Sequence, residues 1–249
     1  MTLGSSTLDK HQWNFASEFD YGYHLLELTR NGRRAQGIVD HLFIQHFSAS
    51  FAPTNNIQFD CDIPVVWYEG LGGGGGSVTS VGEVLLRSRF RLLDSKKYFV
   101  GLALVPFGTI PTGEANHYLS DHGPTLGVLV AVDKDLNSKI SVGFNFGADG
   151  RGHVTFRDLR SGSRFWFSGG VRIKVGPSFT FKGDVTAHSP FSNLFENKVA
   201  SPVELLTDVD YQIKNTPWRV NLGWGLSIVR AAGEPIFRSL AGVAYLFKE

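Results

Sequence analysis

The sequence predicts an all-β protein, an antiparallel up-and-down transmembrane β-barrel of about 12 strands with both termini on the periplasmic side. Three observations predict this fold. Apolar and polar residues alternate along twelve segments, which is the period of a β-strand. The connections between the segments are alternately short and long. No run of about 18 apolar residues is present, so membrane-spanning helices are not expected.

The first half of the chain contains six predicted strands. Segment 57–67, IQFDCDIPVVW, shows the pattern well, because Asp60 and Asp62 fall on the face opposite to its apolar residues. Segment 43–51 is noisier, since Leu42 and Ile44 blur the alternation. In order, the six segments are 13–23, 43–51, 57–67, 84–92, 98–104 and 126–132.

The second half alternates more cleanly. In segment 140–146, for example, Phe144 and Phe146 lie on one face and Asn145 lies on the other. Its six predicted strands are 140–146, 165–173, 179–185, 203–211, 218–226 and 237–247. The total of twelve is an even number, which suits a chain whose two ends meet on one side of a barrel.

The connections place all short turns at one end of the strands. Tight turns follow the even-numbered strands at 52–55, 93–96, 134–137, 176–177 and 214–217. Longer connections, such as TRNGRRAQ and GLGGGGGS, follow the odd-numbered strands. Short periplasmic turns and long outer loops are typical of outer-membrane barrels.

The width of a twelve-stranded barrel decides which face is wet. Barrel diameter grows with strand number, so one layer of side chains cannot fill this interior. Aromatic residues turned inward would line a large dry void, whereas turned outward they meet lipid. A soluble β-sandwich binding module is the alternative, but apart from Pro64 and Pro106 the sequence has few devices that protect sheet edges.

The face opposite to the apolar one carries balanced charges that would point into the lumen. We expect these acids and bases to pair across the interior, so that the lumen is narrow or plugged. The predicted lumen charge cluster is Asp60, Asp62, Glu83, Arg87, Arg89, Arg91, Arg172, Glu204, Asp208, Asp210, Arg219 and Arg238.

Composition excludes several classes of function. The formal net charge is +1, so there is no basic field for nucleic acid. The only cysteine, Cys61, excludes an intramolecular disulfide. The first residues, MTLGSSTLDK, lack the features of a secretion signal. If the protein lies in the outer membrane, we expect that its signal peptide is not included in this sequence. No cofactor is expected.

Several fragments resemble the N-terminal β-barrel region of bacterial OmpA-family outer-membrane proteins. They are DIPVVWYEG (62–70), VGEVLLRSRFRLLD (81–94), IPTGE (110–114), SPVELLTDVDY (201–211) and GEPIFRSLAGVAYLF (233–247). The last strand also resembles an outer-membrane assembly signal at Gly242, Tyr245 and Phe247, although Leu240 stands where a polar residue is usual. The resemblance implies a structural, membrane-organising or porin-like role.

The same resemblance implies one barrel domain over residues 1–249. Family members often continue into a periplasmic domain that binds peptidoglycan, and that domain is absent from this chain. Contact with peptidoglycan is therefore expected only through a domain that is not in this sequence.

An outer-membrane lipid-modifying enzyme is a further alternative. The pair His46 and Ser48 is similar to the His-x-Ser pair of a lipid A deacylase, but it has lumen parity and lacks a matching acid, so no catalytic residues are assigned. His117, His122 and His153 lack the spacing of metal ligands, so no metal site is assigned. The run at 72–76 is interpreted as an outer loop, not a phosphate-binding loop.

Two finer expectations concern the barrel wall. Pro64 has lumen parity inside a strand and is expected to lie in a β-bulge. Small residues on the lipid face predict a homo-oligomer held through the barrel walls, or close contact with membrane lipids. These residues are Ser17, Gly169, Gly183, Ala187, Ser239 and Ala241.

Overall fold

The computed structural model contains fifteen β-strands within the residues that it describes. These residues are 4–30, 33–71, 77–113, 123–152, 154–156, 159–192, 194–195, 200–231 and 234–247. The strands are β1 (Trp13–Arg30), β2 (Arg33–Thr54), β3 (Ile57–Leu71), β4 (Ser77–Val81), β5 (Val84–Leu93), β6 (Gly101–Ile110), β7 (Thr125–Asp135), β8 (Ile140–Gly150), β9 (Val154–Phe156), β10 (Leu159–Ser161), β11 (Arg164–Val175), β12 (Phe179–Pro190), β13 (Val203–Gln212), β14 (Trp218–Val229) and β15 (Phe237–Phe247).

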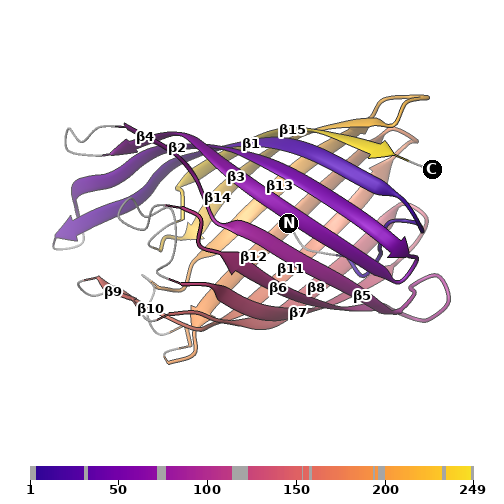
Figure 1. The fold of residues 1–249 in the computed structure, drawn as a ribbon, viewed down its shortest axis with the longest axis horizontal. Coiled ribbons are helices and arrows are strands. Elements are labelled where there is room, and N and C mark those ends of the chain that lie inside the picture. The colour runs from indigo at the N-terminus through magenta and orange to yellow at the C-terminus, as the bar shows by residue number, and fades with distance from the viewer. Residues whose placement is uncertain are drawn as a thin grey trace.

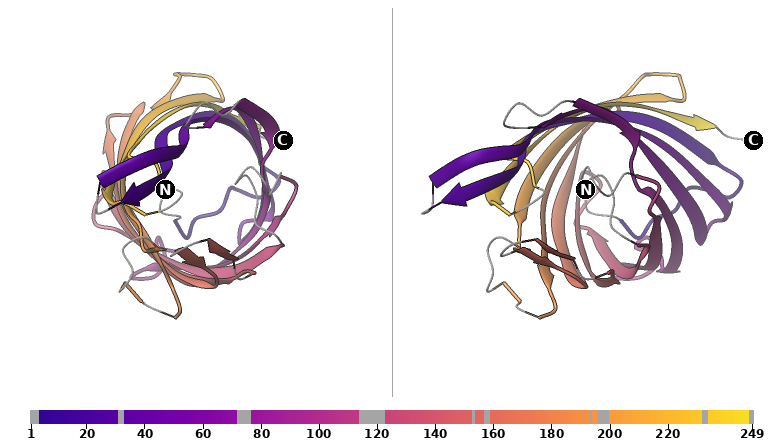
Figure 2. Two further views of the ribbon diagram at one scale, coloured as in Figure 1. Left: turned by 90° about the vertical axis from the view of Figure 1, so that its left-hand side faces the viewer. Right: turned by 60° about the vertical axis from the view of Figure 1, so that its left-hand side comes forward.

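Twelve of these strands close into one antiparallel barrel, which confirms the predicted fold class (Figures 1 and 2). Each barrel strand pairs with its neighbour in sequence, and β1 pairs with β15 to close the ring. The short β4 pairs with the outer part of β3, and β9 and β10 form a separate hairpin. The short turns all lie at one end, here called the short-turn end; the other is the long-loop end.

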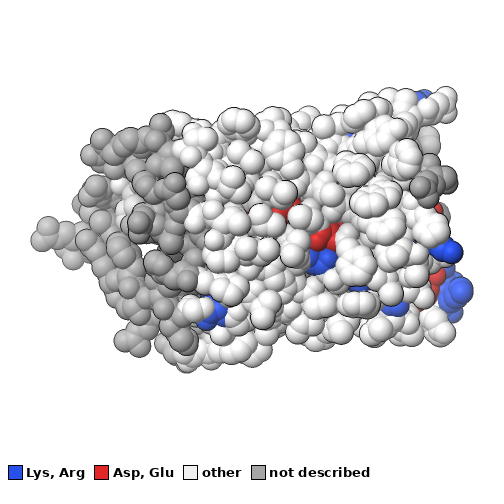
Figure 3. All heavy atoms as spheres, in the orientation of Figure 1, with Lys and Arg blue, Asp and Glu red and all other residues white. Residues whose placement is uncertain are grey.

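The apolar face of the barrel points outward. Phe144 and Leu222 are 61% and 58% exposed, whereas Asp149 and Asp208, which face the lumen, are 2% and 3% exposed. Figure 3 shows one side of the barrel as an almost uncharged belt, with a small acidic and basic group near its middle. Soluble proteins bury apolar side chains and expose charged ones, so this arrangement is the reverse. It suits a barrel that is surrounded by lipid.

Among the described residues, no helix is long and apolar enough to span a membrane.

Aromatic residues collect on the outer surface at the short-turn end. Outer-membrane barrels place such girdles where the hydrocarbon meets the headgroups, because these rings tolerate both environments. The ring pairs are Trp13 with Phe51, Phe179 with Tyr211 and Trp218 with Tyr245, with centroids 4.3, 4.8 and 4.8 Å apart.

The structure differs from the expected elements in its longest hairpin. Residues 29–36 were expected to form a loop, but β1 and β2 continue through most of this stretch and Arg30 pairs with Arg33. The strands therefore extend beyond the apolar segment.

The register shifts by one residue opposite Pro64, where an irregularity was expected. Two residues separate Asp62 from Val65, whereas three separate their partners Leu85 and Val81. The carbonyl of Pro64 accepts a hydrogen bond from the Gly82 amide at 2.8 Å, so its nitrogen faces the break between β4 and β5. At that point the sheet does not require a backbone N–H donor from β3, so proline is tolerated. A second irregularity lies at Trp67, since Val66 and Tyr68 pair with consecutive residues of β2.

Candidate functional site: the barrel lumen

The N-terminal residues 4–12, here called the strap, cross the lumen at the short-turn end. The Leu8 amide donates to Gln58 Oε1 at 2.8 Å, and the Ser6 carbonyl accepts a hydrogen bond from Arg89 Nη1 at 2.6 Å. Further along, the Ser5 amide donates to Asp133 on β7. The strap thus contacts β3, β5 and β7 in turn, and Figure 2 shows it inside the ring of strands.

A glycine in the wall makes room for the strap. Ser5 is 1% exposed, and a Cβ built on Gly101 would overlap its hydroxyl oxygen. Any larger residue at position 101 would therefore force Ser5 away from Asp133. Sequence reasoning missed the strap, because a segment without strand periodicity gives no sign of where it docks.

A charged network lines the wall formed by β1 and β12–β15. Arg238 Nη1 donates to Asp20 Oδ2 at 2.8 Å, and its Nε lies 3.1 Å from Glu204 Oε1. Glu204 comes from β13, so the pair reaches across β14 at Gly225, where a Cβ would lie 2.8 Å from Glu204 Oε1. The missing side chain at Gly225 allows this pairing across a strand.

A second bridge crosses β15 in the same way. Asn221 Nδ2 donates to Glu18 Oε2 at 2.7 Å and to Asp208 Oδ2 at 3.1 Å. Gly242 lies between Glu18 and Asn221 in the register. Lys182 Nζ completes the network at 3.2 Å from Asp208 and 2.5 Å from Asp210. Gly242, assigned from sequence to the assembly signal, thus also clears a path for Asn221.

Glu234 extends this network at the long-loop end. Its Oε2 lies 3.7 Å from Arg238 Nη2. Burial raises the pKa of Glu234 to about 7, although the positive charge of Arg238 opposes the rise. The charge state of this carboxyl therefore changes near neutral pH.

An aromatic and charged cluster lines the β8, β11 and β12 side near the long-loop end. Arg164 Nη2 lies 2.9 Å from Asp149 Oδ2, and the Trp166 indole donates to the same carboxylate. His188 Nε2 lies 3.3 Å from Arg164 Nη1. Asp149 is thereby almost enclosed by its partners. None of these residues belongs to the charge cluster predicted from sequence.

Asp62 bonds to residues of the neighbouring strand, not to arginines across the lumen. Its Oδ2 lies 2.8 Å from His46 Nδ1, and its Oδ1 accepts a hydrogen bond from Ser48 Oγ at 2.7 Å. A nucleophilic serine requires its base within hydrogen-bond reach. Here the hydroxyl of Ser48 donates to the acid instead, so the three residues form a structural bridge between β2 and β3.

Among the remaining members of the predicted charge cluster, Asp60 and Arg87 lie side by side on β3 and β5. Asp60 also accepts a hydrogen bond from Gln58 Nε2 at 2.6 Å. Glu83 lies between the end of β4 and the start of β5. Arg91 bonds to the turn at residues 55–56. Arg172 and Arg219 are exposed. The acids of β13 pair with Lys182 on β12 and Arg238 on β15, not across the interior as expected.

Residues predicted for wall contacts are partly covered. A Cβ on Gly169 would lie 3.3 Å from the Phe144 ring, whereas one on Gly183 would have only Val171 within 4 Å, at 3.8 Å. Ser17 accepts a hydrogen bond from Gln45 on the outer face. The other residues of this group lie on β12 and β15 (Ala187, Ser239 and Ala241), and Tyr245 and Phe247 lie near the end of β15.

The lumen also has an apolar side, which the sequence analysis did not identify. Ala103, Val105 and Ala131 are fully buried on β6 and β7, with Leu129 against them. The segment GLALVPFG (101–108) could have indicated it, because both its odd-numbered and its even-numbered positions are apolar. Such a pattern is typical of a strand that is buried on both faces.

Within the described residues, no group of three or more His, Cys, Asp or Glu side chains could hold a metal ion. His117, His122, His153 and the glycine run at 72–76 lie outside those residues.

Comparison with solved structures identifies barrels with the same fold. The COG4313 outer membrane channel from Pseudomonas putida F1 aligns with a TM-score of 0.77 and 12% identity over 98% of each chain. NanC porin aligns with a TM-score of 0.64 and 11% identity, over 94% of this chain and 98% of its own. KdgM porin aligns with a TM-score of 0.58 and 9% identity, over 95% and 99%.

No family model matches this sequence, and no curated protein matches it. At these identities the likeness concerns the fold alone. The chain therefore has the fold of outer-membrane channels and porins.

Proposed function

We propose that this protein is an integral barrel of the bacterial outer membrane with a porin-like role and a narrow, obstructed lumen. Its short turns and both termini would lie in the periplasm. The strap is the observation that carries the proposal, because it occupies the lumen at one end and is held there by Gln58, Arg89 and Asp133. The outward apolar face and the porin neighbours support the membrane location.

The OmpA-family resemblance is part of this proposal and rests on the sequence fragments alone. It adds a membrane-organising role to the porin-like one. A lipid-modifying activity gains no support from the geometry, because Ser48 is hydrogen-bonded to Asp62 and faces the lumen. An enzyme that acts on membrane lipid would need its nucleophile on the outer surface.

The strap should limit conductance. We expect the intact barrel to give small or no steady single-channel steps in a planar bilayer. Replacing Gly101 by valine should displace Ser5 and increase the step size several-fold, as should deletion of residues 2–9. Gly152→Val is the matched control, because a Cβ at Gly152 has no atom within 4 Å. Large, stable steps from the intact protein, or unchanged steps from both strap variants, would contradict the proposal.

We also propose that copies of the barrel associate through the wall around Gly183 and Ala187. Gly183 leaves open space above the wall, and small residues allow close approach where lipid gives no hydrophobic drive. Mass measurement in mild detergent should therefore detect a homo-oligomer that Gly183→Leu disrupts and Gly152→Leu does not. A strictly monomeric protein in lipid-like detergent would eliminate this idea.

A further inference from the structure

A cavity of about 250 Å³ lies inside the short-turn end, between the strap and the strands β7, β8, β11 and β12. Gly143 and Gly170 face each other across β8 and β11, and both line it. Both positions have lumen parity, so the wall here carries no side chain on two neighbouring strands. The hollow in the wall follows from these two glycines.

The acidic side of the cavity already has partners. Asp133 accepts the hydrogen bond from the Ser5 amide. Asp135 accepts hydrogen bonds from Ser141 Oγ at 2.6 Å and from Ser95 Oγ at 3.5 Å. These carboxylates therefore hold the strap and the adjacent turn in position.

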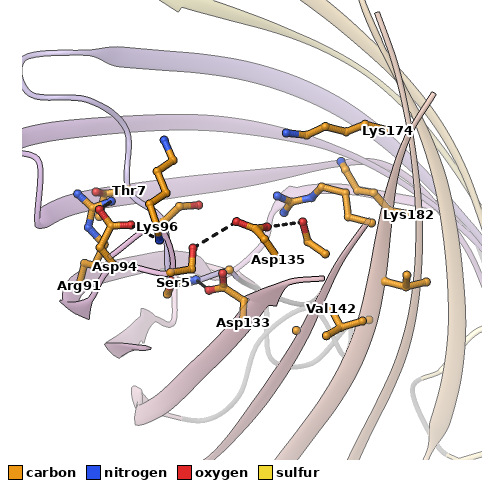
Figure 4. Close-up of a pocket in the computed structure, with 18 of the residues that line it drawn as sticks. Ser5, Thr7, Arg91, Asp94, Lys96, Asp133, Asp135, Val142, Lys174 and Lys182 are labelled. Carbon is orange, nitrogen blue, oxygen red and sulfur yellow. Dashed lines mark hydrogen bonds and ion pairs between the residues drawn. The ribbon is translucent and has the colours of Figure 1, made fainter. Parts of the chain in front are cut away.

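The basic side is only partly satisfied. Lys182 is held by Asp208 and Asp210, as described above. Arg172 and Lys174 are exposed and line the cavity, and within the described part of the chain neither side chain has a hydrogen-bond or ion-pair partner. Figure 4 shows Lys174 and Lys182 pointing toward the cavity, with Asp133 and Asp135 across from them.

The strap closes the cavity beside Arg172. A Cβ on Gly4 would lie 3.9 Å from Arg172 Nη2, so this guanidinium stands against the strap. Arg172 and Lys174 are two residues apart on β11 and share its lumen face, so one anion could contact both side chains beside the strap.

We propose that this cavity binds a small solute through a carboxylate or phosphate group held by Arg172 and Lys174. A guanidinium offers a planar pair of donors to an oxyanion, and an ammonium adds a second charge. The volume is below the roughly 300–1,000 Å³ of pockets for drug-sized ligands, so the solute is small. This inference rests on the proposed function for its role in transport, where the site would select anions at the periplasmic end.

Calorimetric titration of the full-length protein in detergent tests the site, with inorganic phosphate and acetate as separate probes. We expect saturable binding of at least one of them. The double variant Arg172→Gln with Lys174→Gln should weaken that binding by roughly tenfold or more, because two charged donors are lost. Lys214→Gln is the control. It removes an exposed cation from a turn at the same end, outside the cavity, and should leave the affinity unchanged.

Two results would overturn the inference. One is the absence of saturable binding by either anion, or equal binding by the double variant. The other is tighter binding of tetramethylammonium than of both anions, which would assign the cavity to cations through its aspartates. Because binding is measured without a bilayer, its failure is distinct from failure of the conductance test. A conducting barrel that binds neither anion would refute only this site.

Discussion

Replacing Arg238 by leucine should lower the free energy of unfolding by about 3 kcal/mol, the lower end of the range for breaking a buried ion pair. Asp20 and Glu204 are 8% and 6% exposed, and Arg238 is their shared cation. Without it, two carboxylates would remain in the lumen wall with little water to solvate them. The lower end applies because 26% of the Arg238 side chain is exposed.

Urea unfolding of the barrel in lipid vesicles measures this loss. Arg219→Leu is the matched control, because Arg219 has lumen parity but is exposed and forms no ion pair with the described residues. That change should stay within about 0.5 kcal/mol of the unmodified protein. Equal losses from the two variants would mean that the network around Arg238 does not stabilise the barrel.

Replacing Leu222 by arginine should cost about 2–4 kcal/mol, provided that its side chain meets the bilayer near the midplane. Leu222 is 58% exposed on the outer face of β14. Lipid offers a guanidinium no hydrogen-bond partners, so the charge would have to reach the interface or draw water inward.

The neighbouring residue provides the control on the opposite face. Asn221 donates to the carboxylates of Glu18 and Asp208, so an arginine there would keep donors near both acids. Asn221→Arg should therefore cost less than about 1 kcal/mol in the same unfolding measurement. Similar penalties at positions 221 and 222 would show that the outer face does not meet lipid.

The sequence alone determined the twelve barrel strands and the direction of their faces, although not where each strand begins and ends. Each strand has one side toward lipid and one toward the lumen, so alternation with a period of two records this arrangement locally, as at Phe144 and Asn145. Alternating short and long connections likewise recorded the two ends of the barrel. Both patterns can be recognised in the sequence without knowing which strands are neighbours in the barrel.

The pairing of charges could be decided only by the tertiary structure. Strand register and barrel closure bring Arg238 to Glu204 across Gly225, and Asn221 to Glu18 across Gly242. In sequence these glycines look like interruptions, because their role depends on side chains from strands far away in the chain. The alternation of side chains along β5 is enough to assign its arginines to the lumen. It does not indicate which acidic residues these arginines contact.

The strap and the anion cavity were beyond sequence reasoning for the same physical reason. The residues of the strap have no period, and Ser5 is fixed by Gly101 and Asp133, about a hundred residues later in the chain. The cavity exists where Gly143 and Gly170 become neighbours in register and the strap covers them. Local patterns therefore determine the wall of this barrel, whereas long-range register determines what its lumen contains.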